Sequence, residues 1–441
     1  MKVYIIGAGD AGAIAALQVR RLNSEAQVDV FSRRPELGCN PCEIPLVLSG
    51  TVGKWEDLYR GYRVTSFYEK RSIELHLNTE VTDILTGEKK LVANGKRYDY
   101  DKVILALGAT PSVPAFSNLD NKSEFALSTD IVDGRALDDA IPKCNSAAII
   151  GGGFIALEVA EALKARGYGK VHLLVRQDIA RAHLDKDMTE KLKQVLIERG
   201  VNLILPAKIE RIGKKNGKKC VTLPDRELEV DFIFFATGVQ PNVELAQKAG
   251  LEIGKTGGIV VNQYLQTSEP DVYAVGDCME NWDMITGSKR RHQLATNAIR
   301  TGYIAGRNAV TGNKISYAGT VMPLVTKIFG HQVGAVGFTE REAQEKGIET
   351  TAAVVNTAYL REPRRGKPAW YKLVAERKTQ TLLGAQVISE EIVSGTIDKL
   401  AVAIASKMPL VQLVQIDSCY SPHVQEDQVA VPIQRLIDKL G

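Results

Sequence analysis

Two cysteines near the N-terminus have a spacing that suggests chemistry. Cys39 and Cys42 form a C-x-x-C pair within residues 38–45, GCNPCEIP. Such a pair can supply half of a zinc site, a redox dithiol, or one reactive thiol beside a bystander. No second pair of cysteines or histidines lies at metal-ligand spacing, so we predict no metal site. A reactive thiol and two purely structural cysteines remain the open alternatives.

A glycine motif, G-A-G-D-A-G at residues 7–12, follows a short apolar run and precedes a helical pattern. Glycines at this spacing allow a tight turn, close approach of the backbone to a pyrophosphate, and close packing of the helix on the strand. A turn without any ligand is the alternative. The acid that usually holds a ribose about 20 residues further on is replaced by Ser32, followed by Arg33. We predict that Ser32 and Arg33 are cofactor-binding residues, with the serine giving a weaker ribose contact.

A second glycine motif, G-G-G-F-I-A at residues 151–156, has alanine in place of the third glycine. Its following strand ends at Val175, and Arg176 and then Arg181 come next. An acid at the end of that strand favours NADH, whereas an arginine suits the 2′-phosphate of NADPH. The sequence therefore favours NADPH over NADH, although arginines on a solvated surface are also common.

The elements that position these motifs repeat along the chain. Strand, glycine turn, helix and strand occupy residues 3–31 and return at residues 147–175, roughly 145 residues later. Two separate nucleotide-binding domains explain this spacing better than a solenoid. From about residue 317 the dinucleotide pattern is absent.

Residues 102–111 and 232–241 also resemble each other, since each reads as a buried strand that ends in a glycine turn and a proline. Each would close one of the two units, and Ala109 and Gly238 within them are predicted to bind cofactor. In residues 267–278, Asp277 directly follows a strand and a glycine, which places it to bond a polyol hydroxyl.

Composition excludes several classes of protein. The chain has 441 residues with 56 Lys plus Arg and 52 Asp plus Glu, so its net charge of +4 gives no argument for a nucleic-acid or acidic membrane partner. Six cysteines in this length indicate a reducing compartment rather than a disulfide scaffold. No stretch reaches the roughly 18 apolar residues that span a bilayer. We expect a soluble cytoplasmic protein.

The order of these motifs resembles that of the FAD-dependent pyridine nucleotide–disulfide oxidoreductases over essentially the whole chain. Residues 41–45, PCEIP, are similar to the S-C-G-I-P segment of the single-cysteine members, which are coenzyme A disulfide reductases, NADH oxidases and peroxidases, and persulfide reductases. Residues 419–423, CYSPH, are similar to a segment near the last helices of those proteins.

The resemblance implies an α/β fold with two Rossmann-like dinucleotide-binding domains, one inserted in the other, and a C-terminal α+β dimerisation domain. Residues 1–113 and 244–317 would form the FAD-binding domain, 114–243 the NAD(P)-binding domain and 318–441 the dimerisation domain. A homodimer is expected.

The resemblance also implies roles for single residues. Gly7, Gly9 and Gly12 would bind the pyrophosphate of FAD. Asp277 would bind the ribityl chain, and the backbone around Ala295 and Ala298 would lie against the flavin ring. The second glycine motif would bind the pyrophosphate of the nicotinamide cofactor through Gly151, Gly153 and Ala156, with Glu158 nearby. The ring of Phe154 would cover the flavin until the nicotinamide displaces it. Cys42 would be the redox sulfur, and Tyr420 and His423 would reach the active site of the partner subunit.

The predicted activity passes electrons from NADPH, or alternatively NADH, through FAD and Cys42 to a small disulfide, a persulfide or O2. The alternative is a flavin subunit that exchanges electrons between NAD(P) and an iron–sulfur partner protein. Two departures bear on the site. Glu43 replaces the usual glycine and would raise the pKa of a nearby thiol, and Asp10 stands where the family's oxidases and peroxidases carry histidine, which argues against a peroxidase. A basic loop at residues 361–367 suits an anionic substrate or is simply solvated.

Overall fold

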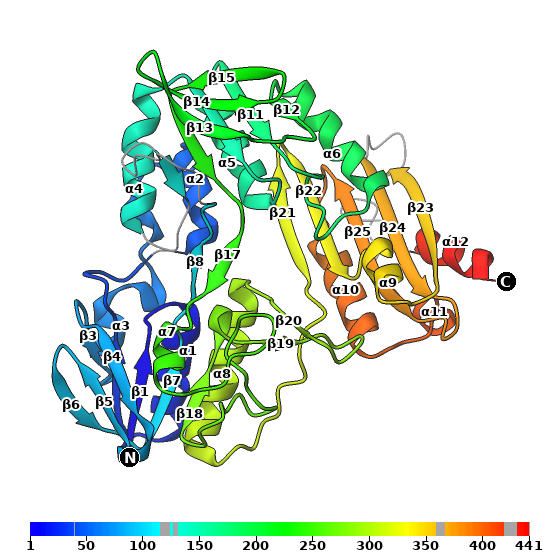
Figure 1. Cartoon of the computed structure of the whole chain (residues 1–441). Helices are drawn as coiled ribbons and strands as arrows, with labels where there is room; N and C mark the ends of the chain where they lie inside the picture. The colour runs from blue at the N-terminus through cyan, green and yellow to red at the C-terminus, as the bar shows by residue number, and fades with distance from the viewer. Residues whose placement is uncertain (39, 115–123, 127–130, 359–366, 419–429, 441) are drawn as a thin grey trace.

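The computed structural model describes residues 1–38, 40–114, 124–126, 131–358, 367–418 and 430–440. Figure 1 shows three units, each built on its own sheet: a first unit that contains the N-terminus, a second unit inserted after it, and a C-terminal unit. The helices and strands that follow are those that position the glycine motifs and Cys42.

The first unit is a parallel five-stranded sheet in the order β18-β7-β1-β2-β3. Residues 3–6 of β1 are all buried, as expected for a strand covered on both faces. Helices α1 (Asp10–Leu22) and α8 (Ala295–Thr311) pack so closely that a Cβ on Gly302 would overlap the carbonyl oxygen of Ala11. The strands are β1 (Lys2–Ile6), β2 (Gln27–Phe31), β3 (Glu74–His76), β7 (Lys102–Leu105) and β18 (Val272–Ala274).

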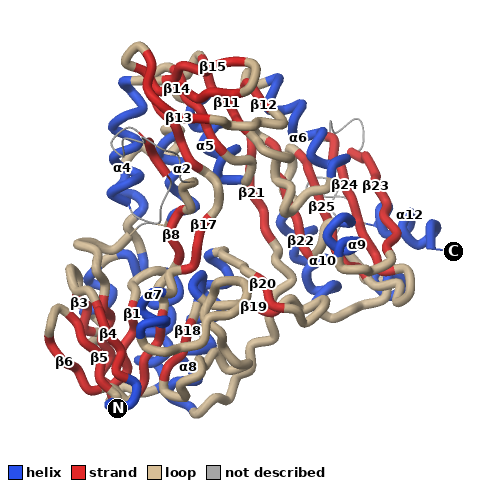
Figure 2. The backbone as a smooth tube through the Cα atoms, in the orientation of Figure 1, coloured by secondary structure: helices blue, strands red, loops and turns tan. Residues whose placement is uncertain are grey.

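A second parallel sheet, in the order β12-β11-β10-β16-β9, repeats this arrangement. Its strands are β9 (Glu124–Ala126), β10 (Ser146–Ile150), β11 (Lys170–Leu174), β12 (Asn202–Ile204) and β16 (Phe232–Phe235). Helices α4 (Ile131–Ala140), α5 (Phe154–Ala165) and α6 (Lys186–Glu198) belong to this unit. A short antiparallel pair, β8 (Ala109–Pro111) with β17 (Val239–Pro241), joins it to the first unit, as Figure 2 shows.

The C-terminal unit is antiparallel, with strand order β21-β22-β25-β24-β23. Helix α10 (Ser394–Ala405) contacts β22 and β25, and α12 (Ala430–Leu440) contacts β23 and β24. Helix α9 (Glu340–Glu345) and the short α11 (Leu410–Leu413) complete the unit. The strands are β21 (Leu324–Ile328), β22 (His331–Gly337), β23 (Thr350–Ala358), β24 (Pro368–Glu376) and β25 (Leu382–Ser389).

The predicted fold class is confirmed, because two parallel sheets, each with a glycine turn and a helix after a central strand, precede an antiparallel sheet that carries helices. The predicted domain limits at residues 113, 243 and 317 stay a prediction. Among the described residues, no helix has the length and apolar character that crossing a membrane requires.

Candidate active site

The first glycine motif joins β1 to α1, and packing requires glycine at two of its positions. Gly7 has φ +114°, and a Cβ there would overlap the carbonyl oxygen of Ala106. A Cβ on Gly12 would overlap the carbonyl oxygen of Gly7. Gly9 differs, since a Cβ would meet nothing within 4 Å, and no side chain caps the N-terminus of α1. An open, uncapped helix N-terminus fits the pyrophosphate of FAD.

Asp277 and the starts of α1 and α8 come together beside this motif. A Cβ on Gly276 would lie 3.2 Å from the Cβ of Ala11 and 3.5 Å from that of Ala298. Burial and, as the smaller cause, the nearby charge of Asp10 together raise the pKa of the Asp277 carboxyl to about 6. A desolvated carboxyl of this kind fits a hydroxyl-rich chain, which would supply the hydrogen bonds that water no longer provides. Ala295 is the first residue of α8.

The predicted ribose contact lies at the end of β2. Ser32 is buried, and its hydroxyl oxygen accepts a hydrogen bond from the backbone N–H of Arg34 at 3.2 Å. The hydroxyl hydrogen therefore stays available to a ligand oxygen. Arg33 is exposed. The roles of both residues stay predictions.

Cys42 lies in a single 3-10 turn, Pro41–Glu43, just before the short helix α2 (Ile44–Leu48). Its backbone N–H donates to the side-chain oxygen of Asn40 at 3.2 Å, and its thiol is exposed. Desolvation by the surrounding protein raises the pKa of this thiol, and four carboxylates raise it further, in decreasing order Glu158, Asp10, Asp277 and Glu43. The direction of the Glu43 effect is the one predicted from the sequence.

The motif residue Asp10 forms a buried ion pair with Arg63, which the sequence did not indicate. Their side chains are 10% and 9% exposed, and Asp10 also accepts a hydrogen bond from Tyr62 at 3.1 Å. Arg63 donates a second hydrogen bond, 3.1 Å long, to the backbone oxygen of Gly38. Arg63 therefore ties the start of α1 to the segment that leads to Cys42. An arginine about 50 residues after its partner carries no local signal, so only the fold reveals the pair.

The second glycine motif repeats the geometry of the first one. Gly151 has φ +135°, and a Cβ there would overlap the carbonyl oxygen of Ala236. A Cβ on Gly153 would meet nothing within 4 Å, and no side chain caps α5. Ala156 is fully buried. The turn again leaves an open helix N-terminus that fits a pyrophosphate.

The first turns of α5 face both the C-terminal unit and the loop after β11. Burial raises the pKa of Glu158, whose carboxylate accepts a hydrogen bond from the Thr326 hydroxyl. The Phe154 ring stacks on His183, with ring centroids 5.5 Å apart and an angle of 15° between the planes. Burial, followed by the charge of Arg290, lowers the pKa of His183 to about 4, so the imidazole is uncharged at neutral pH. The sequence analysis missed His183.

Ala109 is the first residue of β8, and Gly238 directly precedes β17, the two strands that join the first and second units. The backbone N–H of Ser112 donates to the oxygen of Gly238 at 2.9 Å, and Ala109 pairs with Pro241. Arg176 and Arg181 are both exposed on the loop after β11, beyond the buried Val175. Their predicted contacts with cofactor stay predictions.

Some predicted residues lie outside the described part of the chain. These are Tyr420, His423, Cys39 and residues 361–366 of the basic loop. Lys367, the described end of that loop, pairs with Glu390 at 3.2 Å. Within the described ranges, no group of three or more His, Cys, Asp or Glu side chains could hold a metal ion.

Proteins of similar sequence share this arrangement. The family model described as pyridine nucleotide-disulphide oxidoreductase matches residues 1–302, and that of its dimerisation domain matches residues 324–431. The NAD(P)H coenzyme A polysulfide/persulfide reductase of Pyrococcus horikoshii is 34% identical over 432 residues, which cover 96% of this chain and 94% of the relative.

Solved structures agree with the sequence match. The NAD-dependent persulfide reductase from A. fulgidus superposes with a TM-score of 0.95 at 28% identity, covering 100% of this chain and 83% of that one. An engineered water-forming NADPH oxidase, a mutant of the Lactobacillus brevis NADH oxidase, has a TM-score of 0.94 at 25% identity and covers 100% and 99%. The chain is an NAD(P)H-dependent flavoprotein oxidoreductase and belongs to the pyridine nucleotide-disulphide oxidoreductase family.

Proposed function

We propose that this protein uses NADPH to reduce a small disulfide or persulfide, of the coenzyme A type, through Cys42. The single observation that supports this most is the position of the Cys42 thiol. Cys42 is exposed, and the pKa of its thiol is raised by the carboxylates of Asp10 and Asp277 at the FAD motif and of Glu158 beside the second motif. A sulfur in this position can meet a substrate from solvent, and it lies within electrostatic range of groups in both proposed cofactor sites.

FAD, when bound, accepts a hydride from the nicotinamide and passes an electron pair to sulfur. The residues proposed to hold it are the uncapped start of α1 around Gly9, the carboxyl of Asp277, and the start of α8. Cys42 contributes the nucleophile, which is active only as a thiolate. Attack on a substrate disulfide forms a mixed disulfide with Cys42 and releases one thiol, and two further electrons release the second.

The NADPH preference rests on the loop after β11. In the engineered NADPH oxidase, one aspartate is replaced by alanine, the next residue becomes arginine, and a glycine and a proline elsewhere become alanine and arginine. At the adjacent pair of positions the present chain likewise has no acid and an arginine, with Val175 followed by Arg176. Ala156 and Arg181 lie one residue away from the spacing of the other two engineered positions. An arginine here suits a 2′-phosphate, whereas an acid would repel it.

The proposal extends to the oligomeric state of the protein, its cellular location and its partners. We propose a homodimer, because the family's dimerisation domain matches residues 324–431. A cytoplasmic location is supported by the free thiols of Cys42, Cys144, Cys220 and Cys278. An iron–sulfur partner protein gains no support from the family or from the relatives named above.

A Cys42→Ser variant tests the thiol mechanism. We expect it to bind FAD and NADPH normally and to lose at least about 100-fold of its persulfide or disulfide reductase rate, since serine is a far weaker nucleophile. Cys144→Ser, at a half-buried cysteine in the second unit, is the matched control and should keep the wild-type rate. Unchanged turnover of Cys42→Ser with every coenzyme A persulfide and disulfide tested would show that the sulfur is dispensable.

A further inference from the structure

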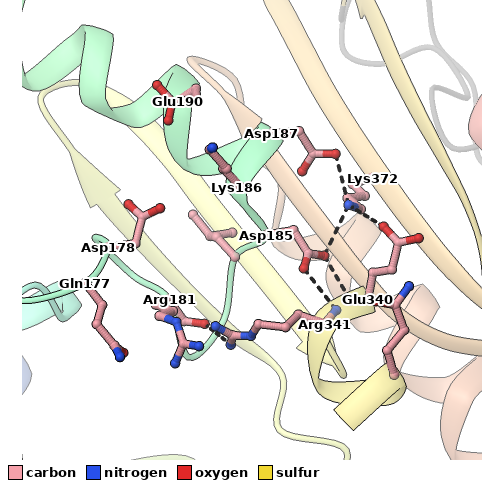
Figure 3. A pocket seen from close by; sticks show the side chains of 12 residues that line it. Gln177, Asp178, Arg181, Asp185, Lys186, Asp187, Glu190, Glu340, Arg341 and Lys372 are labelled. Atoms are coloured by element: carbon pink, nitrogen blue, oxygen red, sulfur yellow. Dashed lines mark hydrogen bonds and ion pairs between the residues drawn. The ribbon is translucent and has the colours of Figure 1, made fainter. Parts of the chain in front are cut away.

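A cleft of about 800 Å³ lies where the second unit meets the C-terminal unit. One wall is the loop after β11, through Gln177, Asp178 and Arg181, and the other is the start of α9, through Glu340 and Arg341 (Figure 3). The loop after the second strand of a dinucleotide-binding unit is the segment that recognises the 2′-position of the adenosine ribose. Helix α9 thus stands beside the specificity loop although it belongs to another unit.

The specificity loop, residues 175–185, is held at its middle and at its end. At its middle, the backbone N–H of Ala180 donates to the oxygen of Gly152 in the second glycine motif at 2.6 Å. At its end, the buried carboxylate of Asp185 accepts hydrogen bonds from the first N–H groups of α9, those of Glu340 at 2.9 Å and Arg341 at 3.3 Å. Asp185 therefore caps a helix of the C-terminal unit, which fixes α9 relative to the loop.

Two arginines, one from each wall, meet at one end of this cleft. The guanidinium of Arg341 donates to the backbone oxygen of Arg181 at 2.7 Å. The Arg181 guanidinium lies 3.9 Å from a carboxylate oxygen of Glu345, and the Nε of Arg341 lies 3.6 Å from the same oxygen. The side chain of Arg181 is 44% exposed, that of Arg341 is 33% exposed, and that of Glu345 is 60% exposed. Two positive charges thus share one solvated carboxylate, which an incoming dianion can replace.

The acidic side chains of the cleft are engaged elsewhere. Asp178 pairs with Lys193 at 2.9 Å. Asp187 and Glu340 lie 2.9 Å and 2.8 Å from the ammonium of Lys372, whose side chain is 5% exposed. Figure 3 shows Lys372 on one side of Asp185 and the guanidinium groups of Arg181 and Arg341 on the other side. The arginine end of the cleft is therefore the end suited to an anion.

We propose that Arg341, together with Arg181, receives the 2′-phosphate of NADPH and displaces Glu345, so that the C-terminal unit helps to select the nicotinamide cofactor. The inference rests on the proposed use of NADPH and adds a specificity-determining residue from outside the dinucleotide-binding unit. Two guanidinium groups offer a phosphate several charge-assisted hydrogen bonds at once. NADH, which has only a hydroxyl at this position, would gain little from either arginine.

The test compares Arg341→Ala with wild-type holoenzyme. We expect KM for NADPH to rise roughly fivefold, as suits the loss of a partly exposed charge-assisted contact. The expected kcat is unchanged, and KM for NADH changes less than about twofold. Inhibition by adenosine 2′,5′-bisphosphate should weaken by the same factor as NADPH binding, while inhibition by ADP stays constant. Arg341→Lys should recover part of the NADPH affinity.

Two further variants separate the possible results. Arg377→Ala removes an exposed arginine of the same unit that pairs with Glu349, and it should leave both KM values unchanged. Equal changes in KM for NADPH and NADH in Arg341→Ala, or none in either, would overturn the role of Arg341. If Arg176→Ala and Arg181→Ala also leave the preference between the two cofactors untouched, the proposed use of NADPH fails as well. If those two lower the preference and Arg341→Ala does not, only the inference about α9 is wrong.

Discussion

At the scale of single residues, the site is dominated by carboxylates. Desolvation by the surrounding protein raises the pKa of the Cys42 thiol, and Glu158, Asp10, Asp277 and Glu43 raise it further. The protein groups alone therefore keep the sulfur protonated at neutral pH. A bound cofactor must therefore favour the thiolate that the reaction needs, and the carboxylates raise the pH at which the thiol ionises.

Substitution of Glu43 directly tests the effect of these carboxylates on the pKa of Cys42. Glu43→Gln should lower the pKa of Cys42, because it removes a negative charge beside the thiol and releases Arg60 from its ion pair with Glu43. The alkylation rate of Cys42, followed by peptide mass spectrometry as a function of pH, should then rise at a lower pH than in the wild-type protein. Glu36→Gln is the control, because Glu36 pairs with Arg135 and is not among the groups that shift Cys42. An unchanged profile in Glu43→Gln would contradict this electrostatic account.

At the scale of the elements, glycine turns and helix N-termini build both proposed cofactor sites. The starts of α1 and α5 have no side-chain cap, and the glycine before each helix faces open space. The first glycine of each motif has the opposite property, since it is fixed by contact with a neighbouring strand end. In each motif, therefore, the first glycine is required by packing, and the glycine before the helix is the one proposed to leave space for the ligand.

This division predicts different outcomes for two alanine substitutions. Gly9→Ala should fold normally, because its Cβ meets nothing in the protein, yet it should lose most of its FAD, because that space is proposed for the pyrophosphate. Gly7→Ala should lose stability outright, by about 2 kcal/mol or more, because its φ is +114° and its Cβ would overlap Ala106. Thermal unfolding and the ratio of flavin to protein absorbance measure both effects. Full FAD content in Gly9→Ala would refute the proposed pyrophosphate site.

Local sequence signals were enough to predict the elements and the motifs, but not the contacts between units. Both glycine motifs and Asp277 could be predicted because each lies within a strand–turn pattern of a few residues. Arg63, His183 and Arg341 could not, since each acts on a residue that folding brings near from a distant segment. Their partners are Asp10, the Phe154 ring and the Arg181 backbone. The short turn and helix around Cys42 carry too few residues for a periodic pattern.

At the scale of the whole molecule, the C-terminal unit carries the match to the family's dimerisation domain and also contacts α5 and the loop after β11. It holds Glu158 through Thr326 and the specificity loop through Asp185. It also exposes large apolar side chains, with Val402 on α10 65% exposed and Val411 on α11 46% exposed. Exposed aliphatic side chains on a dimerisation domain are suited to burial against a second subunit.

Substitution at Val402 tests this surface. Val402→Glu should weaken the dimer, because a buried unpaired carboxylate costs several kcal/mol, and light scattering at micromolar concentration should then detect monomers. Ile197→Glu is the matched control, since Ile197 on α6 is 61% exposed but lies outside the dimerisation domain. A dimer of unchanged stability in Val402→Glu would place the subunit interface elsewhere.

The passage of electrons from NADPH through FAD to Cys42 is tested most directly by anaerobic titration of the holoenzyme with NADPH. After addition of two electrons, the wild-type protein should develop a long-wavelength charge-transfer band between the Cys42 thiolate and the flavin, and the Cys42→Ser variant should not. The band should appear at lower concentrations of NADPH than of NADH. Identical titration spectra for wild-type and Cys42→Ser would contradict the proposed role of the cysteine.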